Sequence, residues 1–253
     1  MDNTQDNIKL KFGLVGRQIS YSFSRGYFAE KFKQENLPYT YVNFDLQAIT
    51  ELNAIIKNTP NLKGLNVTIP YKEEVIPILD SLNKRAKKIG AVNTIRITHN
   101  NKLKGYNTDY YGFKKSLEPH LKKQHKRALI LGTGGASKAI AYALKKLNIT
   151  YNYVSRSKKE GVKFTYLDLT KDIISNYNII INCTPIGTFP NVEACPDIPY
   201  NALSKNHILY DLIYNPEETK FLSYGKRKGA TTINGLEMLK LQAEKAWTIW
   251  NKS

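Results

Sequence analysis

The chain has 253 residues, of which 42% are hydrophobic, and this composition supplies a core and excludes a disordered or fibrous protein. Its two cysteines, Cys183 and Cys195, are too few for a disulfide framework, and no apolar run is long enough to span a membrane. The polar residues 1–6 lack the apolar stretch of a secretory signal, so we expect a cytoplasmic protein, whose formal net charge is +17.

The first hundred residues alternate between strand and helix patterns. Strands are predicted at 9–15, 39–44, 62–69, 92–98 and 103–106, and helices around 27–32, at 46–56 and at 75–82. The last two helices rest on apolar residues that recur at helical spacing. A further helix is predicted at 110–117.

From residue 128 onward the pattern is typical of a parallel sheet. A short apolar strand at 128–131 runs through a glycine-rich turn into a helix at 139–147, and a second strand follows at 151–154. Further buried strands are predicted at 179–183 and 208–212, and a final helix at 236–250. Strand, helix and strand in this order favour a doubly wound α/β domain.

The turn after the strand at 128–131 contains Gly132, Gly134 and Gly135. A glycine turn at a helix N-terminus aims backbone N–H groups at an anion, and the helix dipole favours negative charge there. This context indicates a phosphate-binding turn of the dinucleotide type, although Ser137 occupies the third glycine position of that fingerprint. An ordinary strand-to-helix turn would explain the same glycines.

The second strand of this region ends in Ser155, Arg156 and Ser157. An acidic residue at this place would bind the ribose 2′-hydroxyl of NAD, whereas an arginine suits the 2′-phosphate of NADP. The sequence therefore favours NADP as the cofactor. The alternative is that Arg156 is a solvated loop residue.

Polar side chains gather at four further segments, at 21–24, 66–72, 90–94 and 105–109. Asn66 and Thr68 share one face of a predicted strand, and Lys72 follows just beyond it. Individually these residues are typical of caps, turns and solvated surface, and Asp109 is a candidate helix cap. Together they suggest donors for a polyhydroxylated anion, with one lysine and one aspartate for proton transfer.

Seven segments carry a resemblance to a known family, and they span nearly the whole chain. They are GLNVTIPYK at 64–72, GAVNT at 90–94, NTD at 107–109, GTGGAS at 132–137, NCTPIG at 182–187, DLIYNP at 211–216 and GLEMLKLQ at 235–242. In this order they resemble the motifs of the shikimate dehydrogenase family.

The resemblance implies two α/β domains with a cleft between them. A substrate-binding domain would hold residues 1–108 and 232–253, and a Rossmann-like NADP-binding domain would hold 109–231. The implied reaction is the reversible, NADPH-dependent reduction of 3-dehydroshikimate to shikimate, on the chorismate route to aromatic amino acids.

The resemblance also assigns residues by motif, with Lys72 and Asp109 as the proton-transfer pair and no metal site. The implied substrate-binding residues are Ser22, Ser24, Asn66, Thr68, Asn93, Tyr214 and Gln242. The implied cofactor-binding residues are Gly132, Thr133, Gly134, Gly135, Ala136, Ser155, Arg156, Ser157, Thr184, Ile213 and Gly235. The family has His and Pro beside its two serines, where this chain has Tyr21 and Arg25.

Other functions fit parts of the sequence. A quinate/shikimate dehydrogenase of the same family is the nearest, and a non-catalytic NADP-binding sensor is more remote because it has no use for Lys72 and Asp109. The positive charge also suits a nucleic-acid-binding protein, but no reader motif accompanies it. We therefore expect a small anionic substrate, no nucleic-acid or membrane partner, and a monomer or homodimer.

Overall fold

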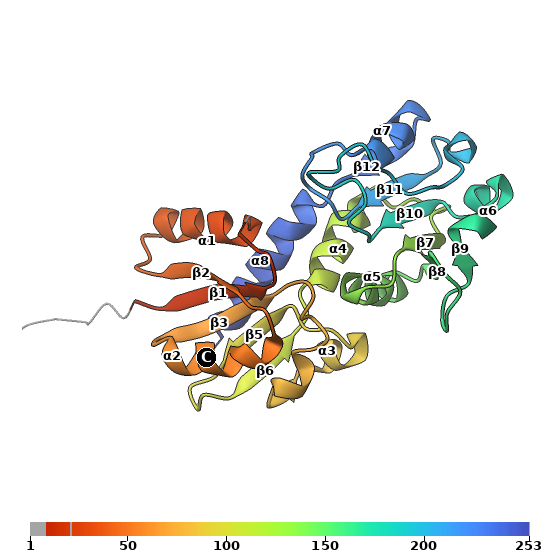
Figure 1. Cartoon of the computed structure of the whole chain (residues 1–253). Helices are drawn as coiled ribbons and strands as arrows, with labels where there is room; N and C mark the ends of the chain where they lie inside the picture. The colour runs from red at the N-terminus through yellow and green to blue at the C-terminus, as the bar shows by residue number, and fades with distance from the viewer. Residues whose placement is uncertain (1–8, 21, 253) are drawn as a thin grey trace, which may run out of the picture. The chain divides into compact units, whose positions relative to one another are not determined.

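A computed structural model describes residues 9–20 and 22–252, and its contacts group them into two compact units (Figure 1). The first unit contains the residues up to Thr108 together with those from Ala243 onward, and the second unit is Asp109–Gln242. Tyr21 and the polar residues 1–6 lie outside the described residues. Within the described part, no helix is both long and apolar enough to cross a bilayer.

The first unit is built on a six-stranded mixed sheet with the order β2-β1-β3-β5-β6-β4. Its strands are β1 (Lys11–Gly16), β2 (Thr40–Asp45), β3 (Leu62–Val67), β4 (Ser81–Leu82), β5 (Thr94–Ile97) and β6 (Leu103–Tyr106). Its helices are α1 (Phe23–Gln34), α2 (Leu52–Asn58) and α3 (Lys84–Ile89). Strands β1, β2 and β3 are parallel, whereas β5 runs antiparallel to both β3 and β6.

Alternating residues of β1 supply both cores of this unit. Phe12 and Leu14 pack with α1 and with the C-terminal helix, whereas Val15 packs in the cluster on the other side, with residues of α2 and α3. Because successive side chains of a strand point to opposite faces, one apolar strand can bury both faces of the sheet.

The second unit is built on a six-stranded parallel sheet with the order β12-β11-β10-β7-β8-β9. Its strands are β7 (Arg127–Leu131), β8 (Thr150–Ser155), β9 (Phe164–Thr165), β10 (Ile179–Asn182), β11 (Ile208–Asp211) and β12 (Thr231–Ile233). Its helices are α4 (Asp109–Leu117), α5 (Gly135–Lys146), α6 (Lys171–Asn176) and α7 (Lys220–Arg227). Numbered within the unit, the strand order is 3-2-1-4-5-6, which is the Rossmann order. The predicted doubly wound α/β fold is thereby confirmed.

Strand β7 shows why the second sheet is covered on both faces. Ala128 and Ile130 pack with α4 and α5, whereas Leu129 and Leu131 pack with residues of α6 and α7. All four side chains are fully buried, as expected for a central parallel strand.

The C-terminal helix α8 (Leu236–Trp250) contributes to the cores of both units. Met238 belongs to the core of the second unit, whereas Ala243 and Trp250 belong to the core of the first. The contacts divide the chain between Gln242 and Ala243, not at the boundary of 231 and 232 expected from sequence. The physical reason is that β12 pairs with β11 and ties its segment to the second sheet.

The helix predicted at 75–82 does not form. The structure has a single 3-10 turn there, η2 (Ile76–Ile78), and Leu82 lies in β4. Pro77 lacks the N–H that a helix needs and disfavours a helical conformation at the residue before it. In addition, the Asp80 carboxylate accepts the backbone N–H of Leu103 at 2.8 Å, which fixes this segment beside β6.

The helix predicted at 46–56 is divided. A 3-10 turn, η1 (Ile49–Glu51), precedes α2, which begins only at Leu52. The short elements α3, β9 and β12 fall where the sequence pattern predicted no separate element, since hydrophobic periodicity is weak over two to six residues.

Candidate functional site

A buried polar network in the first unit links three of the predicted substrate-binding residues. The hydroxyl of Tyr41 on β2 donates to Asn66 Oδ1 on β3 at 2.8 Å and is also hydrogen-bonded to Ser24 on α1. Burial raises the pKa of Tyr41, and the bond with Ser24 opposes that rise. The phenol therefore stays protonated at neutral pH. Because it donates to Asn66 Oδ1, it fixes the orientation of that amide, whose nitrogen is left to act as the donor.

The same network continues from Asn66 to the end of the first unit. The Asn66 amide donates to the carbonyl of Asn93 at 3.2 Å and to the hydroxyl of Thr94 at 3.3 Å. Asn93 in turn donates to the Thr108 hydroxyl at 2.9 Å and accepts the Thr108 N–H at 2.6 Å. The chain is thus fixed at the residue immediately before Asp109, with Asn66 and Asn93 almost fully buried.

Ser22 and Thr68 adjoin the ends of α1 and β3, and Lys72 lies in the turn segment that follows β3. Ser22 is the N-cap of α1, and its hydroxyl accepts the N–H of Arg25 at 3.3 Å. This is the common structural role of a serine at a helix start. Thr68 follows β3 and donates its N–H to the Val15 carbonyl at 2.8 Å. The half-buried Lys72 accepts the N–H of Val92 on its carbonyl at 2.7 Å, so its backbone is tied next to Asn93.

The second unit contains the other three predicted residues, which are Asp109, Tyr214 and Gln242. Asp109 is the first residue of α4 and Gln242 lies on α8, and both are nearly buried. Gly112 allows α4 and α8 to approach closely, because a Cβ there would lie 2.5 Å from the Met238 carbonyl oxygen.

The glycine-rich turn between β7 and α5 has the geometry of an anion site. Gly132 has a φ of 101°, a conformation that favours glycine, and donates its N–H to the Val154 carbonyl at 2.9 Å. Gly134 caps α5, and no atom lies within 4 Å of the place that a Cβ would take. The hydroxyl of Ser137 turns back to the Gly134 carbonyl at 2.7 Å. The first N–H groups of α5 therefore lie at an open helix N-terminus, which fits a pyrophosphate.

Strand β8 ends at Ser155, which is buried, and the exposed Arg156 follows it. Lys159 in the following loop donates to the hydroxyl of Thr133 in the glycine-rich turn at 2.5 Å. Lys159 therefore brings a positive charge to the glycine-rich turn. Sequence reasoning missed Lys159, whose only signal was a basic residue three positions after Arg156.

Thr184 and Ile213 follow the neighbouring strands β10 and β11, and their loops are held by two buried side chains. Asn182 Oδ1 accepts the N–H and hydroxyl of Thr184 at 3.0 and 2.6 Å, and Asp211 Oδ1 accepts the N–H of Ile213 at 3.0 Å. Burial raises the pKa of Asp211 to about 6, against three hydrogen bonds that lower it. Both residues lie in motifs noted in the sequence, but nothing there assigned them a role.

Gly235 packs directly against the backbone after β11. Its N–H donates to the Ile213 carbonyl at 2.9 Å, and a Cβ at this position would collide with the carbonyl oxygen of Leu212. Only glycine permits this approach, so the motif glycine is required by packing whatever it binds.

The predicted cofactor residues all lie at or just beyond the carboxyl ends of parallel strands in the second sheet. The strand order of this sheet reverses between β7 and β10. Gly132 and Thr184, which follow these two strands, are neighbours there, because a Cβ on Gly132 would lie 3.0 Å from Thr184 Cγ2. Ligands of open α/β sheets bind at such a switch point. The residues present therefore fit a dinucleotide.

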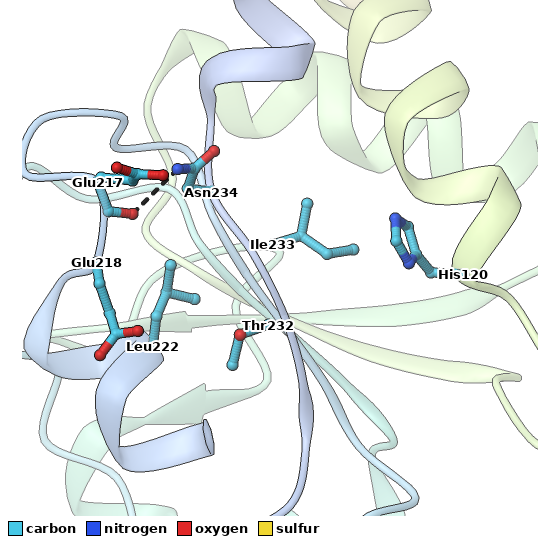
Figure 2. A pocket seen from close by; sticks show the side chains of 7 residues that line it. All are labelled: His120, Glu217, Glu218, Leu222, Thr232, Ile233 and Asn234. Carbon is cyan, nitrogen blue, oxygen red and sulfur yellow. Dashed lines mark hydrogen bonds between the residues drawn. The ribbon is translucent and has the colours of Figure 1, made fainter. Parts of the chain in front are cut away.

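A pocket of about 510 Å³ lies elsewhere in the second unit (Figure 2). It is lined by His120, Glu217, Glu218, Leu222, Thr232, Ile233 and Asn234. Asn234 donates to the Glu217 carbonyl at 3.0 Å across its rim. None of the predicted site residues lines it. Among the described residues, no cluster of His, Cys, Asp and Glu is suited to a metal ion.

Comparison with known proteins gives one consistent result. A family model described as the shikimate dehydrogenase substrate binding domain matches residues 14–95. The chain is 40% identical to shikimate dehydrogenase (NADP(+)) of Methanosphaera stadtmanae over 256 residues, covering 94% of this chain and 90% of that protein.

Solved structures agree with the sequence comparison. A crystal structure of a shikimate dehydrogenase in complex with NADP+ is 38% identical, with a TM-score of 0.84, and covers 96% of this chain and 90% of that chain. Quinate dehydrogenase from Corynebacterium glutamicum in complex with NAD is 25% identical, also with a TM-score of 0.84, and covers 96% and 94%. Shikimate dehydrogenases and this quinate dehydrogenase therefore share the fold. The sequence identity of this chain is higher to the shikimate dehydrogenase.

Proposed function

Because the chain belongs to the shikimate dehydrogenase family, we propose that it catalyses the reversible, NADPH-dependent reduction of 3-dehydroshikimate to shikimate. The enzyme is an NADP-dependent oxidoreductase of aromatic biosynthesis. The observation that carries the proposal is the switch point of the second sheet, where the glycine-rich turn, Thr184 and the open N-terminus of α5 lie together. We also propose that the enzyme works in the cytoplasm as a monomer or homodimer.

The second unit binds the cofactor. Backbone N–H groups of 132–136 bind the pyrophosphate, as the open N-terminus of α5 supports. Arg156, with Ser155 and Ser157, binds the 2′-phosphate by planar bidentate donation. Thr184, Ile213 and Gly235 line the nicotinamide end. When bound, the cofactor supplies the hydride.

Hydroxyl and amide groups bind the substrate. Ser22 and Ser24 bind its carboxylate, and its hydroxyls are bound by Asn66, Thr68, Asn93, Tyr214 and Gln242. The buried network supports this assignment, because Tyr41 and Thr108 fix the amides of Asn66 and Asn93 before any substrate arrives. Such fixed donors need little reorganisation during the reaction.

Lys72 and Asp109 are the proton-transfer pair. In the reductive direction the Lys72 ammonium donates a proton to the oxygen on C3, and in the oxidative direction its amine accepts that proton. Asp109 orients the ammonium and accepts a hydrogen bond from a substrate hydroxyl. The backbone ties of Lys72 to Val92, and of Thr108 to Asn93, support fixed positions for both residues.

The decisive experiment is a spectrophotometric assay of NADP+ reduction with shikimate, run in parallel with quinate and with NAD+. We expect the highest kcat/KM with shikimate and NADP+. No reaction with shikimate contradicts the proposal, and a preference for quinate with NAD+ replaces it with the activity of the C. glutamicum relative.

A further inference from the structure

We propose that Asn182 and Asp211 are positioning residues for the cofactor, because as a hydrogen-bonded pair they hold the two loops that carry Thr184 and Ile213. This inference rests on the proposed function, in which Thr184 and Ile213 contact the dinucleotide. Neither Asn182 nor Asp211 is itself a contact residue in that function.

The two side chains meet between neighbouring strands. Asn182 ends β10 and Asp211 ends β11, and the two are paired in the parallel register. Both are completely buried. The Asn182 amide donates to Asp211 Oδ1 at 3.1 Å, so the last residues of two strands are joined by their side chains as well as by the sheet.

Each member of the pair reaches forward into its own loop. Asn182 Oδ1 accepts both the N–H and the hydroxyl of Thr184, and the Asn182 amide also donates to the Ile186 carbonyl at 3.2 Å. Because the hydroxyl proton of Thr184 is bound to Asn182, the hydroxyl is set as an acceptor toward other partners, and the Ile186 N–H donates to it at 3.2 Å. On the other side, Asp211 Oδ1 accepts the Ile213 N–H.

The choice of a carboxylate at position 211 fits this role. A buried carboxylate is costly, and its retention here requires donors on both oxygens. Oδ1 accepts from Asn182 and Ile213, and Oδ2 accepts the Thr219 hydroxyl at 2.7 Å. Hydrogen bonds to a charged acceptor are stronger than neutral ones, so the loops are held more firmly than a neutral side chain would hold them.

Thr219 provides the control for a purely structural role. It bonds only the far oxygen of Asp211 and caps α7 by accepting the Leu222 N–H at 3.4 Å. Thr219→Val removes one hydrogen bond of Asp211 and the helix cap, and so destabilises the same region. It leaves every bond to Thr184 and Ile213 in place.

The experiment compares the whole enzyme with its Asn182→Ala and Thr219→Val variants, by melting temperature, by kcat and KM, and by calorimetric binding of NADP+ without substrate. For Asn182→Ala we expect the Kd and KM for NADP+ to rise about tenfold, as for the loss of a buried hydrogen bond. The KM for shikimate should change less than about twofold by the same scale. Thr219→Val should lower the melting temperature with little change in the Kd for NADP+.

Other outcomes overturn the proposal. If both variants weaken NADP+ binding in proportion to their loss of stability, the pair is only part of the core. If Asn182→Ala does not fold, Asp211→Asn tests the same point, because Asn keeps an oxygen for Asn182 and Ile213 but loses the charge. Unchanged NADP+ affinity in that variant then contradicts the proposal. Calorimetry separates the positioning role of Asn182 and Asp211 from the proposed activity. If the unmodified enzyme binds NADP+ but does not oxidise shikimate, the proposed activity is wrong, and the positioning role can still be tested by NADP+ binding.

Discussion

The hydroxyl of Tyr41 donates to the side-chain carbonyl of Asn66 over 2.8 Å, although β1 lies between their two strands in the sheet. The phenol stacks on Phe28 with ring centroids 4.8 Å apart, and this packing sets its direction. A residue of the aromatic core thus fixes an amide proposed to bind the substrate.

Tyr41→Phe keeps the ring but removes that donor. Leaving Asn66 Oδ1 unsatisfied in a buried place should cost about 1–3 kcal/mol of unfolding free energy. The KM for shikimate should rise, while the Kd for NADP+ should not change. Urea denaturation and steady-state kinetics check both effects. Tyr39→Phe, in the same aromatic cluster, is the matched control, and an equal KM effect there would refute the network's role.

Lys72→Ala should lower kcat by roughly 10²- to 10⁴-fold, the usual contribution of a positioned acid–base group. Calorimetry should find NADP+ affinity unchanged, because the residue acts on the substrate oxygen. Lys84→Ala, which changes an exposed lysine of α3, serves as the control. Turnover near that of the unmodified enzyme would remove Lys72 from the mechanism.

Arg156→Ala should weaken NADP+ binding and leave NAD+ binding almost unchanged, because only NADP carries the 2′-phosphate. Titration with each cofactor measures the two affinities. The matched control is Lys163→Ala, since Lys163 is exposed in the same loop and also carries a positive charge. Equal losses for both cofactors would assign Arg156 to another part of the dinucleotide.

Asp211 should make stability depend on pH. Burial raises the pKa of this carboxyl to about 6 in the folded chain, whereas an unfolded Asp has a pKa of about 4. The folded state therefore binds more protons than the unfolded state between about pH 4 and 6. Stability contributed by Asp211 is therefore full below about pH 4 and is lost as pH rises through 6, by about 3 kcal/mol in all.

Asp211→Asn removes this titration. The unfolding free energy of the variant, relative to the native sequence, should rise between about pH 4 and 7 in urea denaturation series. His125, whose pKa is lowered mainly by burial, gives the opposite dependence in both proteins and cancels in the difference. Parallel stability curves for the two proteins would contradict the raised pKa of Asp211.

Gly64→Ala should destabilise the first unit by about 1–3 kcal/mol through overpacking. A Cβ at Gly64 would collide with the indole of Trp250, whose Nε1 donates to the Ile95 carbonyl at 3.0 Å. Gly26→Ala is the control, because Gly26 lies in α1 with open space around it and should gain stability. Thermal unfolding compares the two; a stable Gly64→Ala variant would show that α8 can shift.

Much of the second unit was predictable from sequence because its signals are local. An apolar strand, a glycine turn and an amphipathic helix follow one another from Ala128 to Lys146, and the structure has them in that order. The same holds for α8, predicted and observed at 236–250. The family motifs predicted the fold class and the NADP-dependent activity, and the relatives and solved structures confirm both.

What sequence did not supply depends on long-range pairing. Strand β12 is three residues long and exists because it pairs with β11, and this pairing moved the boundary between the units. The roles of Tyr41 and Asp211 depend on partners brought close by the sheets, which no spacing along the chain reveals. The individual site assignments remain predictions for the experiments above.

The shared helix α8 has a consequence for the order in which the chain can fold during synthesis. The first unit lacks Trp250, and with it the partner of Gly64 and Phe12, until all of the second unit has been translated. At bacterial or eukaryotic elongation rates that interval lasts roughly 7 to 27 s. The nascent first unit must wait through it with one face of its sheet covered by α1 but not by α8. A ribosome-stalled chain ending near residue 242 should therefore recruit chaperones more than the released protein does.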